Sequence, residues 1–117
     1  MSSEPGGGEG VDRVLAALAD PTRRQVLDLL AAEGEATATA LAERLPISRQ
    51  AVVKHLVVLD DAGLVSSTRV GREVLYVVVP AALNVTARWM DRLAADWDRR
   101  LATIKRVAEA AERDSRP

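Results

Sequence analysis

Hydrophobic residues recur every three or four positions in four successive stretches of the N-terminal half, which is the spacing of amphipathic helices. Polar residues supply the expected helix starts. Asp20 can cap the second helix, with Pro21 at its first position, and Ser48 can cap the fourth. Gly63 is a typical C-terminal stop. Thr37 or Thr39 can cap the third. The four predicted helices cover about residues 11–18, 21–33, from 37 or 39 to 45, and 48–62.

The break between the third and fourth predicted helices is short and contains Pro46. A short helix, a tight break and a longer helix have the spacing of a helix-turn-helix. Two stretches rich in β-branched residues follow at 64–69 and 72–79, and Gly71 between them can take the positive φ of a hairpin turn. A helix-turn-helix followed by a two-stranded hairpin is a winged helix. We therefore predict a mainly α fold with a small β-hairpin.

The C-terminal part predicts one long helix, or two with a soft break near Asn84, because neither proline nor glycine occurs in residues 81–113. About 30 helical residues span roughly 45 Å, and a compact chain of this length is only about 35 Å across. The apolar stripe along this helix is too large to leave in water. It consists of Val85, Trp89, Leu93, Trp97, Leu101, Ile104 and Ala108.

Part of this stripe should cover the domain's own core, and the remainder should pack against a second copy of the chain. The alternative is that the whole helix folds back on its own domain. The residues predicted to form the dimer contact are Leu15, Leu18, Trp89, Leu93, Trp97, Leu101 and Ile104.

The predicted organisation has four parts. Residues 1–10 are rich in Gly, Ser, Pro and Glu, which is typical of a disordered tail. Residues 11–80 form the winged helix-turn-helix, residues 81–113 the dimerisation helix, and residues 114–117 a C-terminal tail.

The fourth predicted helix has two distinct faces. Val52, Leu56 and Leu59 share one stripe, which should pack inward. The other face combines arginine, glutamine, lysine and valine, which can read guanine, adenine and thymine edges in a major groove. Ser48 and the helix N-terminus can hold a phosphate. The alternative is an ordinary solvated helix face.

Arg69 and Arg72 flank the predicted hairpin turn, where they can reach the minor groove or its phosphates. Solubilising charge on a hairpin edge is the alternative. The residues predicted to contact DNA are Ser48, Arg49, Gln50, Val53, Lys54, Val57, Arg69 and Arg72.

Composition and charge narrow the function classes. The net charge is −1, but residues 44–72 carry five basic residues against two acidic ones, and only the face that contacts DNA has to be positive. The chain has no cysteine and one histidine, which excludes thiolate and His-rich metal sites. No nucleophile–base pair or phosphate loop is visible. We predict no enzyme activity, no metal and no cofactor.

The chain has no apolar run of membrane-spanning length and no signal peptide at its N-terminus. We therefore expect a cytoplasmic protein without a membrane partner.

Three segments resemble, in order and spacing, the characteristic stretches of ArsR-type (ArsR/SmtB) winged-helix repressors. They are LADPTRRQVLDLL (18–30), AERLPISRQAVVKHLVVLDDAGLV (42–65) and RVGREVLYVV (69–78). The resemblance implies a dimeric bacterial repressor that binds double-stranded DNA. Such a repressor either leaves its operator when an effector binds or simply represses. It places Arg49, Gln50, Val53 and Lys54 on the recognition helix, and Arg69 and Arg72 on the wing.

The chain departs from the metal-sensing members of that family. Its third helix, ATALAER (38–44), has no cysteine pair, and its last helix has no histidine. The resemblance is therefore to a non-metal subgroup. Val53 stands where the family often has a small hydroxyl residue, so the operator sequence does not follow from the resemblance.

The main hypothesis is a homodimeric, sequence-specific repressor with two recognition helices about 34 Å apart on a pseudo-palindromic operator. Two alternatives stay open. One is a winged-helix protein-interaction module, which would need an apolar or acidic recognition face, whereas Arg49 and Lys54 are basic. The other is a sensor that binds an unidentified small-molecule effector at the dimer seam.

Overall fold

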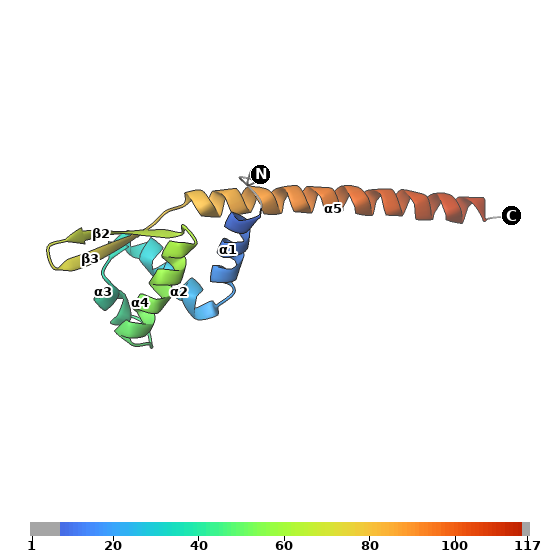
Figure 1. Cartoon of the computed structure of the whole chain (residues 1–117). Coiled ribbons are helices and arrows are strands. Elements are labelled where there is room, and N and C mark those ends of the chain that lie inside the picture. The colour runs from blue at the N-terminus through green and yellow to red at the C-terminus, as the bar shows by residue number, and fades with distance from the viewer. Residues whose placement is uncertain (1–7, 116–117) are drawn as a thin grey trace.

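A computed structural model describes residues 8–115 as five helices and three short strands (Figure 1). Most of the predicted tail, residues 1–7, lies outside the described residues, as do residues 116–117. Residues 9 and 10, which we expected in the tail, belong to the first helix. The elements are α1 (Glu9–Leu18), α2 (Pro21–Glu33), β1 (Glu35–Ala36), α3 (Ala38–Ala42), α4 (Arg49–Asp61), β2 (Val65–Val70), β3 (Glu73–Val78) and α5 (Ala81–Asp114).

Side-chain caps start three of the helices. The Asp20 carboxylate accepts the backbone N–H of Thr22 at 2.8 Å and of Arg23 at 3.1 Å. The Thr37 hydroxyl accepts the N–H of Ala40, and the Ser48 hydroxyl that of Ala51, each at 3.1 Å. Because these contacts satisfy N–H groups that have no intrahelical partner, they fix where α2, α3 and α4 begin, as predicted.

The Asp20 cap makes stability depend on pH. Its pKa lies below 3.8, chiefly because the Arg23 N–H donates to the carboxylate. A lowered pKa in the folded state gives stabilisation that is complete above the unfolded pKa and lost as the pH falls through the folded one. Asp20→Asn keeps a capping oxygen but does not titrate.

We therefore expect the melting temperature of the wild type to exceed that of Asp20→Asn at pH 7, with the difference shrinking below about pH 4. Thermal unfolding followed by circular dichroism from pH 7 to pH 2 measures this difference. A difference that stayed constant over that range would contradict this role for the Asp20 charge.

The third helix is shorter than predicted. It ends at Ala42 rather than near Leu45, and the following residues tighten into three-residue turns, with hydrogen bonds from Arg44 N–H to the Leu41 carbonyl and from Leu45 N–H to the Ala42 carbonyl. Residues 43–48 therefore connect α3 to α4. The helix-turn-helix is confirmed, with a longer connection than the short break predicted around Pro46.

The three strands form one antiparallel sheet in the order β1-β3-β2. The predicted hairpin is β2–β3, with Val70 opposite Glu73 and Gly71 at φ 64° in the turn. The two-residue strand β1 was not predicted; it pairs Ala36 with Tyr76 of β3. The sheet is thus the expected wing with one additional short edge.

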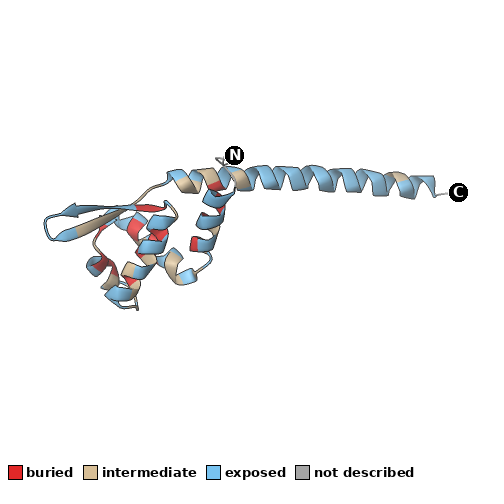
Figure 2. Cartoon of the chain, in the orientation of Figure 1, coloured by how far each residue is buried: buried red, intermediate tan, exposed pale blue. Residues whose placement is uncertain are grey.

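The core lies where α1, α2, α3 and α4 meet the sheet (Figure 2). The predicted inward stripe of α4, formed by Val52, Leu56 and Leu59, is fully buried there. Leu30 and Leu41 are buried against it from α2 and α3. This packing leaves the opposite face of α4 toward solvent.

Helix α5 is one continuous helix of 34 residues, about 51 Å long at 1.5 Å per residue. Its first turns belong to the domain, because Thr86 is buried and Ala82 and Leu83 pack against the core. The rest projects away from the body (Figure 1), and the chain measures 80 × 38 × 20 Å. The chain does not adopt the alternative in which all of α5 folds back on its own domain.

None of the described helices has both the length and the apolar character needed to cross a bilayer.

Candidate nucleic-acid interface

Six of the eight residues that we predicted to contact DNA lie on α4 or at its N-cap, and five of these six are exposed. Val53 is the exception, because it is half-buried and packs against the core. Val57 is 53% exposed, so of the two valines predicted to contact DNA it is the one that presents an apolar group to solvent. The exposed members of the predicted set at α4 are Ser48, Arg49, Gln50, Lys54 and Val57.

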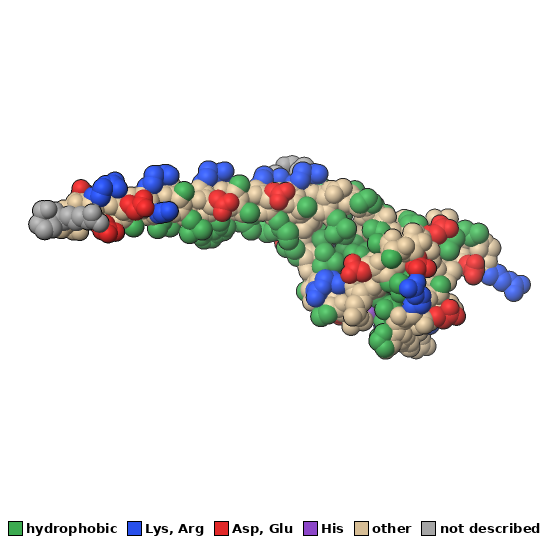
Figure 3. Space-filling view, turned by 180° about the vertical axis from the view of Figure 1, so that it is seen from behind, with side chains coloured by type: hydrophobic (Ala, Val, Ile, Leu, Met, Phe, Trp, Pro, Cys, Tyr) green, Lys and Arg blue, Asp and Glu red, His purple; other side chains and the backbone are tan. Residues whose placement is uncertain are grey.

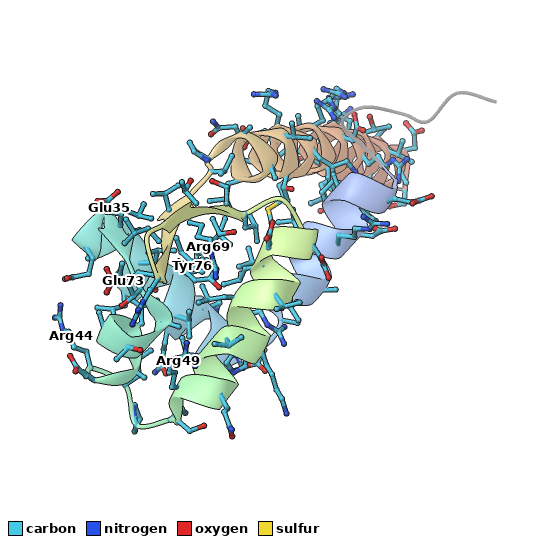
Figure 4. All side chains as sticks on the ribbon, turned by 60° about the vertical axis from the view of Figure 1, so that its left-hand side comes forward. Glu35, Arg44, Arg49, Arg69, Glu73 and Tyr76 are labelled. Carbon is cyan, nitrogen blue, oxygen red and sulfur yellow. The ribbon has the colours of Figure 1, made fainter. Side chains whose placement is uncertain are left out.

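Arg49, the first residue of α4, is tied to the preceding helix. Its Nε donates a hydrogen bond to the Thr39 hydroxyl of α3 at 3.0 Å. This contact spans the turn of the helix-turn-helix. It directs the guanidinium toward the side of α4 that faces the wing (Figure 4).

The two arginines of the wing occupy different positions on the hairpin, Arg69 on one face of the sheet and Arg72 just after the turn. The register places Arg69 opposite Val74, and side chains two residues apart share a sheet face. Arg69 therefore lies on the face that carries Val74 and Tyr76, between the hairpin and the helices (Figure 4). Arg72 follows the Gly71 turn and is exposed.

A cleft of about 280 Å³ separates the recognition helix from the wing. Arg49 and Arg72 reach it from different elements, and Glu73 adds one carboxylate. The structure thus brings together the first residue of α4 and the wing tip. The full lining is Thr37, Ala38, Thr39, Arg49, Val53, Arg72, Glu73, Val74 and Tyr76.

Six of the nine residues that line the cleft were not predicted to contact DNA, and Tyr76 and Thr39 are two of these six. Tyr76 is half-buried, and it both packs on the core and lines the cleft. Thr39 was considered only as a helix cap, a role that Thr37 fills. No sequence signal identifies Thr39, because its partner lies ten residues away across a turn.

The cations of this face are available to an external anion. Arg44 is engaged, since it pairs with Glu33 at 2.5 Å. Within residues 8–115, Arg49, Lys54, Arg69 and Arg72 form no ion pair with a carboxylate. Four unpaired cations around one helix face and one hairpin suit a polyanion.

A second unpartnered surface runs along α5. Hydrophobic side chains line one edge of this helix, and charged ones line the other (Figure 3). Exposure rises along the predicted stripe, from 42% at Leu93 to 61% at Ile104. Met90 and Val107, which were not predicted, extend it at 47% and 63% exposed.

The other predicted dimer residues lie closer to the domain. Leu15 and Trp89 are half-buried, and Leu18 packs against its own core. The guanidinium of Arg100 lies 5.3 Å from the centre of the Trp97 ring, over its face. The free apolar surface is therefore the distal part of α5, while Leu18 serves at least partly within the protomer.

Comparison with known proteins places this geometry among transcriptional regulators. A helix-turn-helix domain model matches residues 18–68. The transcriptional repressor SdpR of Bacillus subtilis is 36% identical over 80 residues, which cover 68% of this chain and 88% of that protein.

Solved structures extend the likeness over most of the fold. An ArsR-like transcriptional regulator from Rhodococcus sp. RHA1 is 49% identical, with a TM-score of 0.77, over 85% of this chain and 92% of the other. A homodimeric winged helix-turn-helix DNA-binding domain from Mycobacterium bovis is 32% identical, with a TM-score of 0.58, over 75% of this chain and 80% of the other.

Proposed function

The chain belongs to the ArsR family of DNA-binding transcriptional regulators, and on this premise we propose that it is a homodimeric repressor of a pseudo-palindromic operator. Helix α4 enters the major groove, and the β2–β3 wing follows the neighbouring backbone or minor groove. The observation that carries this proposal is the set of four unpaired cations on α4 and the wing. Acting on a bacterial chromosome places the protein in the cytoplasm.

The side chains divide into base-reading and phosphate-holding groups. Arg49 and Gln50 have the forked and amide groups that pair with guanine and adenine edges, and Val57 can contact a thymine methyl. Lys54, Arg69, Arg72 and the capped N-terminus of α4 at Ser48 hold phosphates. Val53 contributes less contact area, because it is half-buried.

Dimerisation would complete the DNA-binding unit. The exposed edge of α5 is too apolar to remain in water, and a two-fold interface presents the same patch from both copies. The Mycobacterium bovis relative is a homodimer of this domain type. Two copies joined through α5 would present two α4 helices to half-sites about one DNA turn apart.

A protein-interaction module without a DNA role fits this surface less well. Such a module would need an apolar or acidic recognition face, and the exposed face of α4 is basic at Arg49 and Lys54.

The wing gives a prediction that separates phosphate contact from base reading. Arg72→Ala should weaken binding to specific and competitor duplexes by the same factor, because a phosphate contact carries no sequence information. The slope of log affinity against log salt should fall by roughly 1 per protomer. Anisotropy titrations at several salt concentrations measure both quantities.

Arg88→Ala is the matched control, since it removes an exposed arginine from α5. It should leave affinity and slope unchanged. A selective loss on the specific duplex with Arg72→Ala would mean that the wing reads bases instead.

The operator itself can be found by selection. Wild-type protein is incubated with a random duplex library, and the bound sequences are enriched and aligned. We expect an inverted repeat whose half-sites are 10–11 base pairs apart. Enrichment of no sequence, or of a single asymmetric half-site, would contradict the proposed dimeric reader.

A further inference from the structure

The hydrogen bond between α3 and α4 restricts the side chain that we assign to base reading. Arg49 Nε donates to the Thr39 hydroxyl at 3.0 Å, and this is the one hydrogen bond that the Arg49 side chain makes within the described residues. Both Nη groups of the guanidinium therefore keep their N–H donors. Arg49 is held at one end and free at the other.

This arrangement determines which edge of the guanidinium meets DNA. An arginine can form a bidentate pair either through its two Nη groups or through Nε and one Nη. With Nε occupied by Thr39, only the pair of Nη groups remains. That pair spans two parallel N–H directions, which match guanine O6 and N7.

Apart from the hydrogen bond to Arg49, the Thr39 side chain has no evident structural role. It is exposed on α3, and the α3 cap is supplied by Thr37 instead. Thr39 and Arg49 both line the cleft between the recognition helix and the wing. The hydroxyl thus lies at the edge of the candidate interface.

We propose that Thr39 is a positioning residue for DNA recognition, whose hydroxyl holds the Arg49 guanidinium so that its two Nη groups face the base edge. The inference rests on the proposed function of this chain. Its physical basis is preorganisation: a long side chain already held in its bound conformation loses less rotamer freedom on binding. Thr39 acts only through Arg49.

The test compares Thr39→Val with Thr39→Ser. Valine keeps the β-branched shape but removes the acceptor, and serine keeps the acceptor. Because Thr39 is exposed, both variants should melt within a few degrees of the wild type. Duplexes selected by the wild type from a random library serve as probes, and binding to every single-base variant gives a preference profile.

We expect Thr39→Val to lower discrimination by roughly 2- to 10-fold per half-site, the value of one hydrogen bond. The loss should fall at the same base step that Arg49→Ala affects, and Thr39→Ser should restore the preference there. Thr39→Val combined with Arg49→Ala should cost no more than Arg49→Ala alone. A role limited to folding would weaken all sequences equally and would not produce this pattern.

The matched control is Thr103→Val on α5, where the Thr103 hydroxyl accepts a hydrogen bond from Arg106 at 3.2 Å. It removes the same kind of contact far from α4 and should leave the profile unchanged. An unchanged profile with Thr39→Val would overturn the inference while the proposed function stands. Failure of the wild type to enrich any sequence would overturn both.

The free protein offers an independent readout. The Nε–H group of Arg49 can be followed by nitrogen-15 NMR without DNA. We expect its exchange with water to be slower in the wild type and in Thr39→Ser than in Thr39→Val. Equal exchange in all three proteins would overturn the proposed positioning contact, whatever the DNA result.

Discussion

Replacing Leu101 with glutamate is expected to convert the dimer into a monomer. Leu101 is 56% exposed in the single chain, midway along the distal part of α5. Burying a leucine stabilises the dimer by about 2 kcal/mol. In a two-fold dimer each substitution occurs in both copies, so its effect is doubled. Removing about 4 kcal/mol raises the dimer dissociation constant roughly 1,000-fold, before the cost of desolvating the new carboxylate is added.

The control for this substitution is the next residue. Ala102 is also exposed, but one residue of helix turns it about 100° away from the apolar edge. Ala102→Glu should therefore leave self-association intact. Sedimentation equilibrium of both variants over a range of concentrations measures the dissociation constants. A dimeric Leu101→Glu would show that α5 pairs through another face.

Loss of the dimer should also abolish operator binding at physiological concentrations. Each monomer holds one α4 helix, so it can contact only one half-site. The tight specific affinity of a dimer would fall toward that of non-specific binding.

Removing the Arg49 guanidinium is expected to have the second large effect. Arg49→Ala should cost about 1–3 kcal/mol per half-site at one base step and relax the preference for guanine there. Preferences at the other positions should persist, because Gln50 and Val57 occupy other turns or sides of α4. Competition with single-base variants of the selected duplex measures the loss at each position.

Arg88→Ala again provides the control for charge, since it removes an exposed arginine on α5. A uniform loss on all sequences with Arg49→Ala would assign Arg49 to a phosphate instead. The cleft that Arg49 shares with Arg72 would then be a backbone clamp.

Local features of the fold were predictable from sequence because their causes are local. The caps at Asp20 and Ser48 act within three residues of their partners. The Gly71 turn between two stretches rich in β-branched residues predicts a hairpin for the same reason. These features define the helix-turn-helix and the wing, so the overall architecture followed from the pattern.

Two features of the fold, one set by a distant contact and one by a close choice between local hydrogen bonds, were not predictable. A two-residue strand such as β1 has no periodicity, and its pairing depends on Tyr76 and Val77, about 40 positions away. The early end of α3 depends on a choice between three- and four-residue hydrogen bonds after Ala42. Pro46 indicates only that the helix must stop before it.

In the candidate site, too, features with a local cause could be predicted and features that depend on distant packing could not. Helical spacing alone separates the buried face of α4 from the basic one, as Leu56 and Arg49 show. It cannot show that Val53 lies against the core, because that depends on where α3 and the sheet pack. Nor can it reveal the hydrogen bond between Arg49 and Thr39, which forms only after the turn has folded.

The proposed function is that a dimer of this chain binds a specific operator. Its most direct test is an anisotropy titration of the wild type on its selected duplex, at two salt concentrations with excess competitor DNA. Sedimentation of the complex gives the stoichiometry. We predict competitor-resistant binding by two protomers per duplex, with an affinity that falls steeply as salt rises. Binding no tighter than to competitor DNA at both salt concentrations would contradict the proposed function.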